Sequence, residues 1–372
     1  MSASNRPRAS NTATFYKEAT TREAAEAEAR GWTKLVSRLQ VPDLRGRPSL
    51  PDRHLLAYED VFASARCDLL LGDVIALADR DPAVLPRLAR LVDGVCQDLR
   101  AAAAETGEVV PLADCVPALY LDRIRPGGRL DRWYLLRDLP LTLPHTDMTL
   151  TVRELADYSV TANGRPLTLD VAASIDSARH ALVPDRRWLA GLTQGDPTEP
   201  NIADPLCWLD FECAGRNTAA GDAANFLWYL MAMGGWLVPR YQPDVYARTL
   251  HLALPARTSP RIDHLELHAT ARHIDIRYSW NMGPGRHAAV KGALHGLCDQ
   301  GGIGMDELHA FLALRILGVI PAGRLTGHDL LLVLIKLAES QDPAVSLDAF
   351  FTTAPAPHSD PGERSRNVPA PA

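Results

Sequence analysis

The chain has 372 residues, of which 47% are hydrophobic and 23% are charged. This apolar content excludes a disordered or a fibrous chain, and the length suits two domains or one domain with a large insertion. The net charge of −6 argues against a surface dominated by contacts with nucleic acid or anionic membrane.

The elements predicted before residue 63 are short and mixed in type. Two runs have the aromatic, branched and threonine content of strands, and a helical periodicity separates them. They are predicted as a strand at 13–19, a helix at 23–39 and a strand at 54–62. The polar start and the proline-rich end of the chain are predicted to be disordered tails, at 1–12 and 354–372.

After residue 63 the pattern becomes mainly helical. An Asp-Pro pair begins a helix predicted over 81–104. Two hairpins are predicted next. One, over 120–136, turns at Pro126-Gly127-Gly128, and the other, over 150–171, turns at Asn163-Gly164, the strongest two-residue hairpin signal.

The remaining apolar periods predict further helices. They lie at 171–190, 222–237, 243–253, 261–280, 305–318 and 326–340. The chain is therefore expected to have a first domain over 13–62 and a second over 63–353. The second domain would carry a β-rich insertion at about 105–170.

The segment Gly191–Leu230 carries the candidate chemistry. Asp196 and Asn201 lie in an irregular loop with two prolines, and a short buried strand that follows ends at Asp210. Carboxylate and carboxamide oxygens are ligands that suit Mg²⁺. An acid on the loop can accept a hydroxyl proton, and phosphoryl transfer needs little more than a base, positioning and a metal charge.

This segment resembles the catalytic loop and metal motif of the aminoglycoside phosphotransferase family, a branch of the protein-kinase-like fold. The family pattern His-Gly-Asp-x4-Asn followed by Ile-Asp-Phe/Trp-Glu is matched by Gln194-Gly195-Asp196-x4-Asn201 and Leu209-Asp210-Phe211-Glu212. The resemblance implies that Asp196 is the catalytic base and that Asn201 and Asp210 hold the metal. Asp222 matches an acid that braces the catalytic loop, and Gln194, in place of histidine, is expected to be scaffolding.

The resemblance extends more weakly over residues 13–62. Lys17 lies where the family places a strand lysine that contacts nucleotide phosphates. Only four of the 39 basic residues are lysines, and an ammonium group is not interchangeable with a guanidinium group, which favours a chemical role for Lys17. Glu28 is expected to pair with Lys17, with Glu26 as the alternative. Glu59 and Asp60 are expected at the hinge beside the adenine ring.

The implied fold is α+β and two-lobed, of the protein-kinase-like type. A small N-terminal lobe would cover 13–62, and a large, mostly helical C-terminal lobe with the insertion would cover 63–353. Residues 1–16 contain no glycine, so a glycine-rich loop between two strands is not expected from them. The first lobe is therefore expected to be truncated.

The expected function is transfer of the γ-phosphoryl group of ATP or GTP, with Mg²⁺, to a hydroxyl of a small molecule such as an antibiotic or a metabolite. Aminoglycosides are not expected as acceptors, because only Asp342 and Asp348 stand where that branch has an acidic cluster. One alternative is a kinase of Ser or Thr in a peptide during bacterial modified-peptide biosynthesis, with the predicted hairpins as docking surface. Another is a pseudokinase-like partner or binding protein without catalysis.

Two further clusters are given structural interpretations. His264 and His268 lie four residues apart on a predicted helix, with His273 beyond. They lack a metalloprotease order and a third ligand, so a surface or substrate-lining helix is favoured over a zinc site. The first predicted hairpin is rich in arginine, and its charges are offset by aspartates. It is interpreted as a solvated sheet face, with binding of a peptide or an acidic substrate as the alternative; the arginines are Arg123, Arg125, Arg129, Arg132 and Arg137.

The six cysteines form no Cys-x-x-Cys pair and no zinc spacing. Without a signal-peptide pattern they are expected to be reduced thiols in a cytoplasmic protein. The longest apolar run, residues 226–239, is too short to span a bilayer, so no membrane partner is expected.

Overall fold

In a computed structural model of the chain, the first strands form a small antiparallel sheet. The structure describes residues 13–50, 53–136, 138–247 and 259–352. In the sheet, β4 lies between β1 and β2 and also pairs with β3. The strands are β1 (Thr14–Ala19), β2 (Leu44–Gly46), β3 (Ser49–Leu50) and β4 (Arg53–Glu59). Both strands predicted in this region are confirmed, while the tails predicted at 1–12 and 354–372 lie outside the described residues.

The helix α1 (Arg22–Leu35) packs on this sheet. It begins after Thr21, whose hydroxyl accepts a hydrogen bond from the Ala24 N–H at 3.1 Å and so satisfies one of the free donors of the first turn. Its buried face is built of small and apolar residues with one charged exception, Glu28. The predicted helix is confirmed, although it ends at Leu35 because the chain then turns back toward β2.

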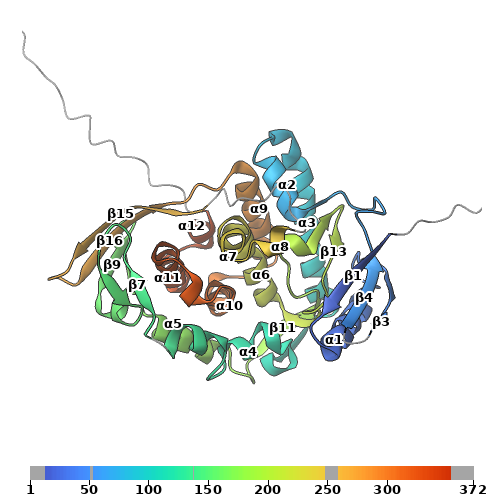
Figure 1. The fold of residues 1–372 in the computed structure, drawn as a ribbon, viewed down its shortest axis with the longest axis horizontal. Helices are drawn as coiled ribbons and strands as arrows, with labels where there is room; N and C mark the ends of the chain where they lie inside the picture. Colours follow the sequence, from blue (N-terminus) through green and yellow to red (C-terminus); the bar gives the residue numbers. More distant parts are fainter. Residues whose placement is uncertain (1–12, 51–52, 137, 248–258, 353–372) are drawn as a thin grey trace, which may run out of the picture.

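The larger part of the molecule is a body of packed helices. The helices are α2 (Leu71–Ala78), α3 (Leu85–Glu105), α4 (Leu121–Ile124), α5 (Val171–Ala181), α6 (Ala219–Trp228), α7 (Val238–Tyr241), α8 (Asp244–Ala247), α9 (Pro284–Leu294), α10 (Met305–Gly318), α11 (Gly327–Gln341) and α12 (Leu347–Phe351). The small sheet lies at one end of the long axis of the molecule, and the hairpin β15–β16 lies at the other (Figure 1).

Short 3-10 and π-helical segments connect these helices. The 3-10 segments are η1 (Pro82–Val84), η2 (Leu112–Asp114), η3 (Pro117–Leu119), η5 (Glu154–Asp157), η6 (Glu199–Asn201) and η9 (Ala322–Arg324). The π segments are η4 (Asp131–Leu135), η7 (Tyr229–Leu237) and η8 (His295–Asp299).

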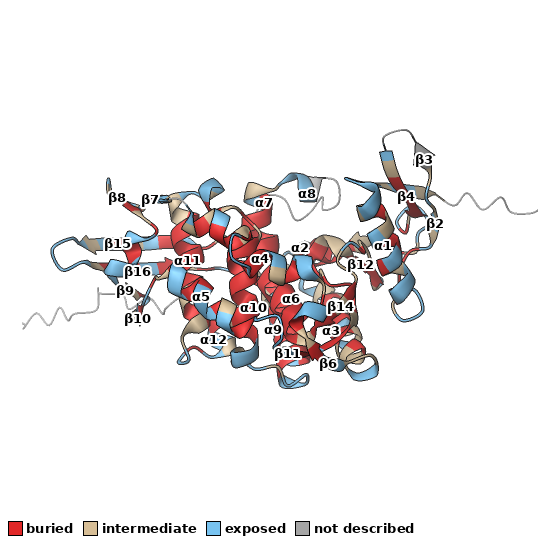
Figure 2. Ribbon diagram, turned by 90° about the horizontal axis from the view of Figure 1, so that it is seen from below, coloured by how far each residue is buried: buried red, intermediate tan, exposed pale blue. Residues whose placement is uncertain are grey.

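The centre of the core is formed by α6, its π-helical continuation η7, and the adjacent helices α10 and α11. All residues of η7 are buried, as are most of α10 and α11 (Figure 2). Large aromatic side chains fill the space between these helices, where they supply much of the apolar area removed from water; they include Trp228, Trp236, Trp280, Phe311 and Phe350.

The remaining strands form small sheets on the helical body. Their orders are β14-β11-β6, β13-β12-β5, β10-β9-β16-β15 and β7-β8. The strands are β5 (Leu69–Leu70), β6 (Glu108–Pro111), β7 (Pro140–Thr142), β8 (Thr149–Thr151), β9 (Ser159–Ala162), β10 (Arg165–Leu167), β11 (Arg187–Thr193), β12 (Ile202–Asp204), β13 (Cys207–Trp208), β14 (Gly215–Thr218), β15 (Arg261–His268) and β16 (His273–Ser279). Together with the helices, they confirm the α+β class.

Several element predictions are confirmed. The hairpin β9–β10 turns at Asn163-Gly164, where both residues adopt the positive φ that a type I′ turn requires. Helices cover the predicted ranges 81–104, 305–318 and 326–340, and α6 continues through η7 to cover 222–237. Of the helix predicted over 243–253, only α8 falls within the described residues.

Three predictions are wrong. Residues 120–136 form α4, a turn and η4 instead of a hairpin, because Leu130 and Tyr134 are buried at helical spacing and Asp131 accepts the Gly127 N–H across the turn. Residues 261–280 form the strands β15 and β16, since Ile274, Ile276 and Tyr278 alternate inward with a period of two. The helix predicted over 171–190 ends at Ala181 before a proline, and β11 follows.

Among the helices in the described ranges, none combines the length and the apolar character that crossing a bilayer requires.

A buried aspartate near the start of α11 ties η7 and α7 to this helix. The Asp329 carboxylate accepts hydrogen bonds from Trp236 Nε1 at 3.1 Å, from Arg240 Nη1 at 2.7 and 2.8 Å, and from the Tyr241 hydroxyl. Burial alone would raise the pKa of Asp329, but hydrogen bonds from His328, Tyr241 and Arg240 lower it to about 2. The charged form is therefore the one that the fold stabilises.

We expect Asp329→Asn to lower the free energy of unfolding by about 3 kcal/mol at neutral pH, because a buried ion pair loses one partner. Since the pKa is depressed in the folded state, the contribution is present above about pH 4 and is lost as the pH falls toward 2. Urea unfolding at about pH 7 and about pH 3 measures both effects. A variant as stable as the wild type at neutral pH would contradict this prediction.

Candidate active site

Lys17 forms an ion-pair junction between β1, α1 and the turn after β13. Its Nζ lies 2.7 Å from Glu28 Oε2 and 2.8 Å from Asp210 Oδ1. Glu28 is buried and also accepts a hydrogen bond from the Tyr58 hydroxyl on β4 at 3.1 Å. The structure thus brings Glu28 against Lys17, whereas Glu26 forms ion pairs on the exposed face of α1.

The electrostatics of this junction keep the ammonium charged. Burial lowers the pKa of Lys17, but the carboxylates of Asp210 and Glu28 outweigh burial and raise it above its ordinary value. Burial raises the pKa of Glu28, against the opposing effect of Lys17. An ammonium group has three N–H donors, and two of them face carboxylates here, so one remains to bind an anion.

Asp196 follows β11 in the loop that leads to η6. Its Oδ1 accepts a hydrogen bond from Asn225 Nδ2 on α6 at 2.9 Å, and its Oδ2 accepts one from Asn201 Nδ2 at 3.2 Å. The Asp196 N–H donates to Gln194 Oε1 at 2.8 Å. The side chain is nevertheless 37% exposed. The carboxylate is therefore oriented from both sides and still accessible to a substrate.

Gln194 links this loop to the segment that carries Asp210. Its Nε2 donates to the carbonyl oxygens of Leu209 at 2.9 Å and Asp210 at 2.5 Å. Asp210 has a φ of 60°, in the left-handed region that aspartate tolerates better than most residues. Its Oδ1 also accepts the Glu212 N–H at 3.2 Å. The amide of Gln194 thus couples the position of Asp196 to that of Asp210.

The turn before Asp196 requires glycine. Gly195 has a φ of 83°, which L side chains rarely adopt. A β-carbon at this position would lie 2.3 Å from the carbonyl oxygen of Cys213 and 2.6 Å from Asn217 Nδ2. Any larger residue would push the loop away from the segment after Asp210.

Asp222, in the first turn of α6, lies beneath this loop. Its Oδ2 accepts a hydrogen bond from the Thr193 hydroxyl at the end of β11 at 2.7 Å, and Asn217 Nδ2 donates to the same hydroxyl at 3.1 Å. Asp222 Oδ1 is buried without a hydrogen-bond partner in the described residues. Burial raises the pKa of Asp222 to about 7, despite the hydrogen bond from Thr193 and the charge of Arg315.

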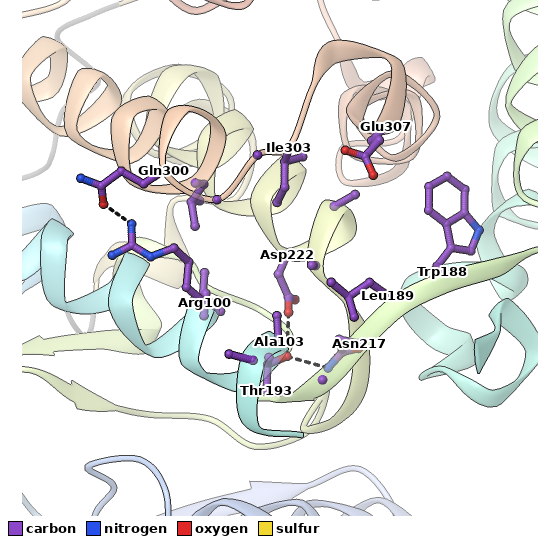
Figure 3. Close-up of a pocket in the computed structure, with 18 residues that line it drawn as sticks. Arg100, Ala103, Trp188, Leu189, Thr193, Asn217, Asp222, Gln300, Ile303 and Glu307 are labelled. Atoms are coloured by element: carbon purple, nitrogen blue, oxygen red, sulfur yellow. Dashed lines mark hydrogen bonds between the residues drawn. The ribbon is translucent and has the colours of Figure 1, made fainter. Parts of the chain in front are cut away.

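A cavity of about 470 Å³ lies behind the loop, lined on one side by Thr193, Asn217 and Asp222 (Figure 3). Residues of α3 and of the segment leading into α10 line the other side. Lys17, Asp196 and Asp210 are not among its lining residues, so the cavity is separate from the candidate site.

Glu59 and Asp60 lie at and just after the end of β4, where a hinge is expected. Glu59 accepts hydrogen bonds from Arg66 Nη1 at 3.0 Å and Ser64 Oγ at 2.9 Å, and Asp60 Oδ1 accepts the N–H groups of the following turn. Both side chains are thus engaged in this turn. Within the described residues, neither side chain forms a hydrogen bond or an ion pair with Lys17 or Asp210.

Sequence reasoning missed a buried ion pair that anchors the loop. Glu199, in η6, is fully buried and lies 2.5 Å from Arg286 Nη1 on α9. Gly234 leaves the space for it, because a β-carbon there would lie 1.9 Å from Glu199 Oε1. No local signal pairs Glu199 with a residue 87 positions later. The hydrogen bond from Asn225 to Asp196 was also not predicted, although Asn225 lies three residues after Asp222, one turn along α6.

The donor set at Asp210 and Asn201 fits a magnesium ion. Asn201 donates through Nδ2 to Asp196, which leaves its carbonyl oxygen for a cation, and Asp210 has a second carboxylate oxygen besides the one that faces Lys17. Mg²⁺ is usually bound by one or two carboxylates together with water and substrate phosphates. The described residues contain no group of three or more His, Cys, Asp or Glu that would form a metal cage of their own.

The histidines predicted on a helix lie instead on the hairpin β15–β16. The rings of His268 and His273 stack with centroids 5.8 Å apart, and His264 and His268 approach Glu266. The side chains of His264 and His268 are 41% and 45% exposed, so the structure places them on the surface of a hairpin and not on a helix.

Neither the protein-family models nor the curated proteins that were compared with this chain match it. The function is therefore inferred from the residues and their geometry.

The pKa of Asp222 predicts a specific dependence of stability on pH. The folded-state value of about 7 lies above the unfolded value of about 3.9, so the stabilising contribution is complete below pH 4 and is lost as the pH rises through 7. As the pH rises from about 4 to about 8, we expect the free energy of unfolding of Asp222→Asn to increase by up to about 4 kcal/mol relative to that of the wild type.

Denaturant unfolding across this pH range, with the exposed-site variant Asp93→Asn as control, measures the difference. A constant gap between the wild type and Asp222→Asn would contradict the prediction.

Proposed function

We propose that this protein is a phosphotransferase of the two-lobed protein-kinase-like type, which moves the γ-phosphoryl group of ATP or GTP to a hydroxyl of a small molecule. The observation that carries the proposal is the contact of Lys17 with Asp210, 193 residues apart in the chain and supported by Glu28. In this proposal, the ammonium group of Lys17 binds the nucleotide phosphates beside Asp210, a candidate metal ligand. The resemblance to aminoglycoside phosphotransferases supports the same roles.

In the proposed reaction, Asp196 orients the acceptor hydroxyl and accepts its proton. The hydroxyl oxygen forms a bond to the γ-phosphorus as the bond between this phosphorus and the β,γ-bridging oxygen breaks, and the nucleoside diphosphate leaves. The proton passes from the Asp196 carboxylate to solvent, to which the side chain is open.

Asn201 and Asp210 would hold Mg²⁺, which neutralises charge on the β- and γ-phosphates when bound. Lys17 contributes its remaining N–H donor to the phosphates, and Glu28 fixes the direction of the ammonium group. Gln194 and Glu199 hold the loop so that the base stays in register with the metal ligands. This agrees with a reaction that depends on positioning and electrostatics.

Nucleotide binding is the first test. We expect ATP with Mg²⁺ to raise the melting temperature, by a stabilisation of about 2.7 kcal/mol at a 100-fold excess over Kd. Lys17→Met should need at least ten times more nucleotide than the wild type for the same rise in melting temperature. Lys34→Met, which changes an exposed lysine outside the site, should match the wild type. If the wild type shows no shift with ATP or GTP, a partner protein without catalysis is favoured instead.

The base assignment has a separate test. We expect Asp196→Asn to retain the nucleotide-induced rise in melting temperature and to lower kcat by about 10²- to 10⁴-fold, because binding and proton transfer use different groups. Turnover is measured as nucleoside diphosphate release with the acceptor, and Asp93→Asn is the control. Unchanged turnover in Asp196→Asn would overturn the role of Asp196.

A further inference from the structure

Three arginines gather at the C-terminal end of α10, and one of them, Arg315, approaches Asp196. Arg315 lies one turn before this end, and its Nη1 is 4.0 Å from Asp196 Oδ1. Arg123, on α4, packs against the end of α10, since a β-carbon at Gly318 would lie 3.3 Å from Arg123 Nη1. Arg129 Nη1 donates to the Gly318 carbonyl oxygen at 2.9 Å. Two segments almost 200 residues apart thus bring three positive charges to the end of α10, where Arg315 faces the candidate base.

This cluster is not the solvated sheet face that the sequence suggested. Arg123 is 8% exposed and Arg315 is 3% exposed. A prediction of surface arginines therefore fails for Arg123, because residues 121–124 form a short helix that turns this side chain toward α10. Arg125, in contrast, is exposed and lies 3.8 Å from Asp122.

The buried guanidinium groups have unused hydrogen-bond donors. Nη1 of Arg123 and Nη2 of Arg315 are buried and make no hydrogen bond within the described structure. Among the described residues, one carboxylate lies within 4.0 Å of any of these three guanidinium groups: that of Asp196, which faces Arg315. Buried polar groups are normally paired, so two unpaired cationic donors at one place indicate a missing anionic partner.

The charge balance agrees with this geometry. Burial, together with the positive charges of Arg315 and Arg129, lowers the pKa of Arg123 to about 9. The cluster therefore has a net positive charge that the fold itself does not neutralise. Arg129 is only partly buried and Asp196 is partly exposed, so solvent reaches the cluster at these two residues.

We propose that Arg123, Arg129 and Arg315 bind an anionic group of the phosphoryl acceptor, and so select an acceptor that has a carboxylate or a phosphate monoester near its reacting hydroxyl. Guanidinium groups bind both anions through paired N–H donors. Because Arg315 lies 4.0 Å from the candidate base, the anionic group and the hydroxyl are separated by only a few bonds. The acceptor is thus a small hydroxy acid or a sugar phosphate, and a cationic amino sugar is repelled.

This inference rests on the proposed phosphotransferase function, but its test uses no nucleotide. The melting temperature of the full chain is measured against sodium phosphate, with sodium chloride at equal ionic strength as reference to remove general screening. We expect phosphate to raise the melting temperature of the wild type more than chloride does. Arg123→Gln and Arg315→Gln should each raise the phosphate concentration at half-saturation at least tenfold. Arg125→Gln, in the same segment, should behave as the wild type.

Two variants separate this cluster from the rest of the site. Lys17→Met removes phosphate binding at Lys17 itself, but the part of the phosphate effect that depends on Arg123 and Arg315 should remain in this variant. Asp196→Asn should strengthen that part, because a negative charge 4.0 Å from Arg315 is removed. If a glutamine variant does not fold, Arg123→Lys or Arg315→Lys replaces it; loss of the paired donors should still weaken phosphate binding. The proposal is overturned if phosphate and chloride act alike on the wild type. It is also overturned if the arginine variants respond as the wild type does, or if Lys17→Met alone loses the effect.

A competition experiment distinguishes the two proposed classes of acceptor. Glycerate and glycerol 3-phosphate are titrated against bound phosphate, and the better competitor identifies the anion as carboxylate or phosphate monoester. Displacement by glucosamine as effective as by either anion would contradict the proposal. Failure of the phosphotransferase function itself would appear separately, as no response to ATP or GTP while the effect of phosphate stays dependent on Arg123 and Arg315.

Discussion

The arrangement of the whole candidate site depends on one ammonium group held between two carboxylates. Lys17 comes from the sheet at one end of the molecule, Glu28 from the helix packed on this sheet, and Asp210 from the helical body. A partly buried charge is stable only where opposite charges lie close to it. The three segments therefore have to meet, because otherwise the charges of Lys17 and Glu28 would lack a partner. The junction therefore sets the distance between the sheet and the loop that carries Asp196.

The loop itself is held by buried polar contacts instead of regular secondary structure. Asn201 and Asn225 donate hydrogen bonds to the Asp196 carboxylate, and Gln194 Oε1 accepts the Asp196 N–H. Glu199, in the same loop, is anchored by Arg286. Burying such groups is costly unless each finds a partner, which makes a correctly paired loop rigid and a wrongly placed one unfavourable. Rigidity of this kind is what a base and a metal ligand need in order to act at the same atom.

Charge is distributed unevenly around this rigid loop. Carboxylates and one ammonium group face the side toward the small sheet, and guanidinium groups gather on the side toward α10. In the proposed function, the first side would bind the phosphates of a nucleotide together with a cation, and the second would bind an anion of the acceptor. This uneven charge is the electrostatic basis of both proposals.

Local patterns in the sequence were sufficient for elements whose stability is local. The capped helix at 22–35, the turn at Asn163-Gly164 and the largely buried helices α10 and α11 follow from capping, turn chemistry and apolar residue content. The residues of the candidate site were also chosen from the sequence, because their spacing along the chain resembles that of a known family. It failed where apolar residues fit two periods, as in 261–280, which became strands because β16 pairs with β9.

Contacts between distant segments were decided by the tertiary structure alone. Spacing within the chain does not pair Glu199 with Arg286, nor bring Arg123 and Arg315 together beside Asp196. Both pairings depend on how the helices pack, because a side chain's burial and its charged neighbours arise only when elements far apart in the chain meet. The sequence by itself thus determined the types of residue available for chemistry and most of the local elements. Packing decided which charges are buried, which are paired, and on which side of Asp196 the positive charge lies.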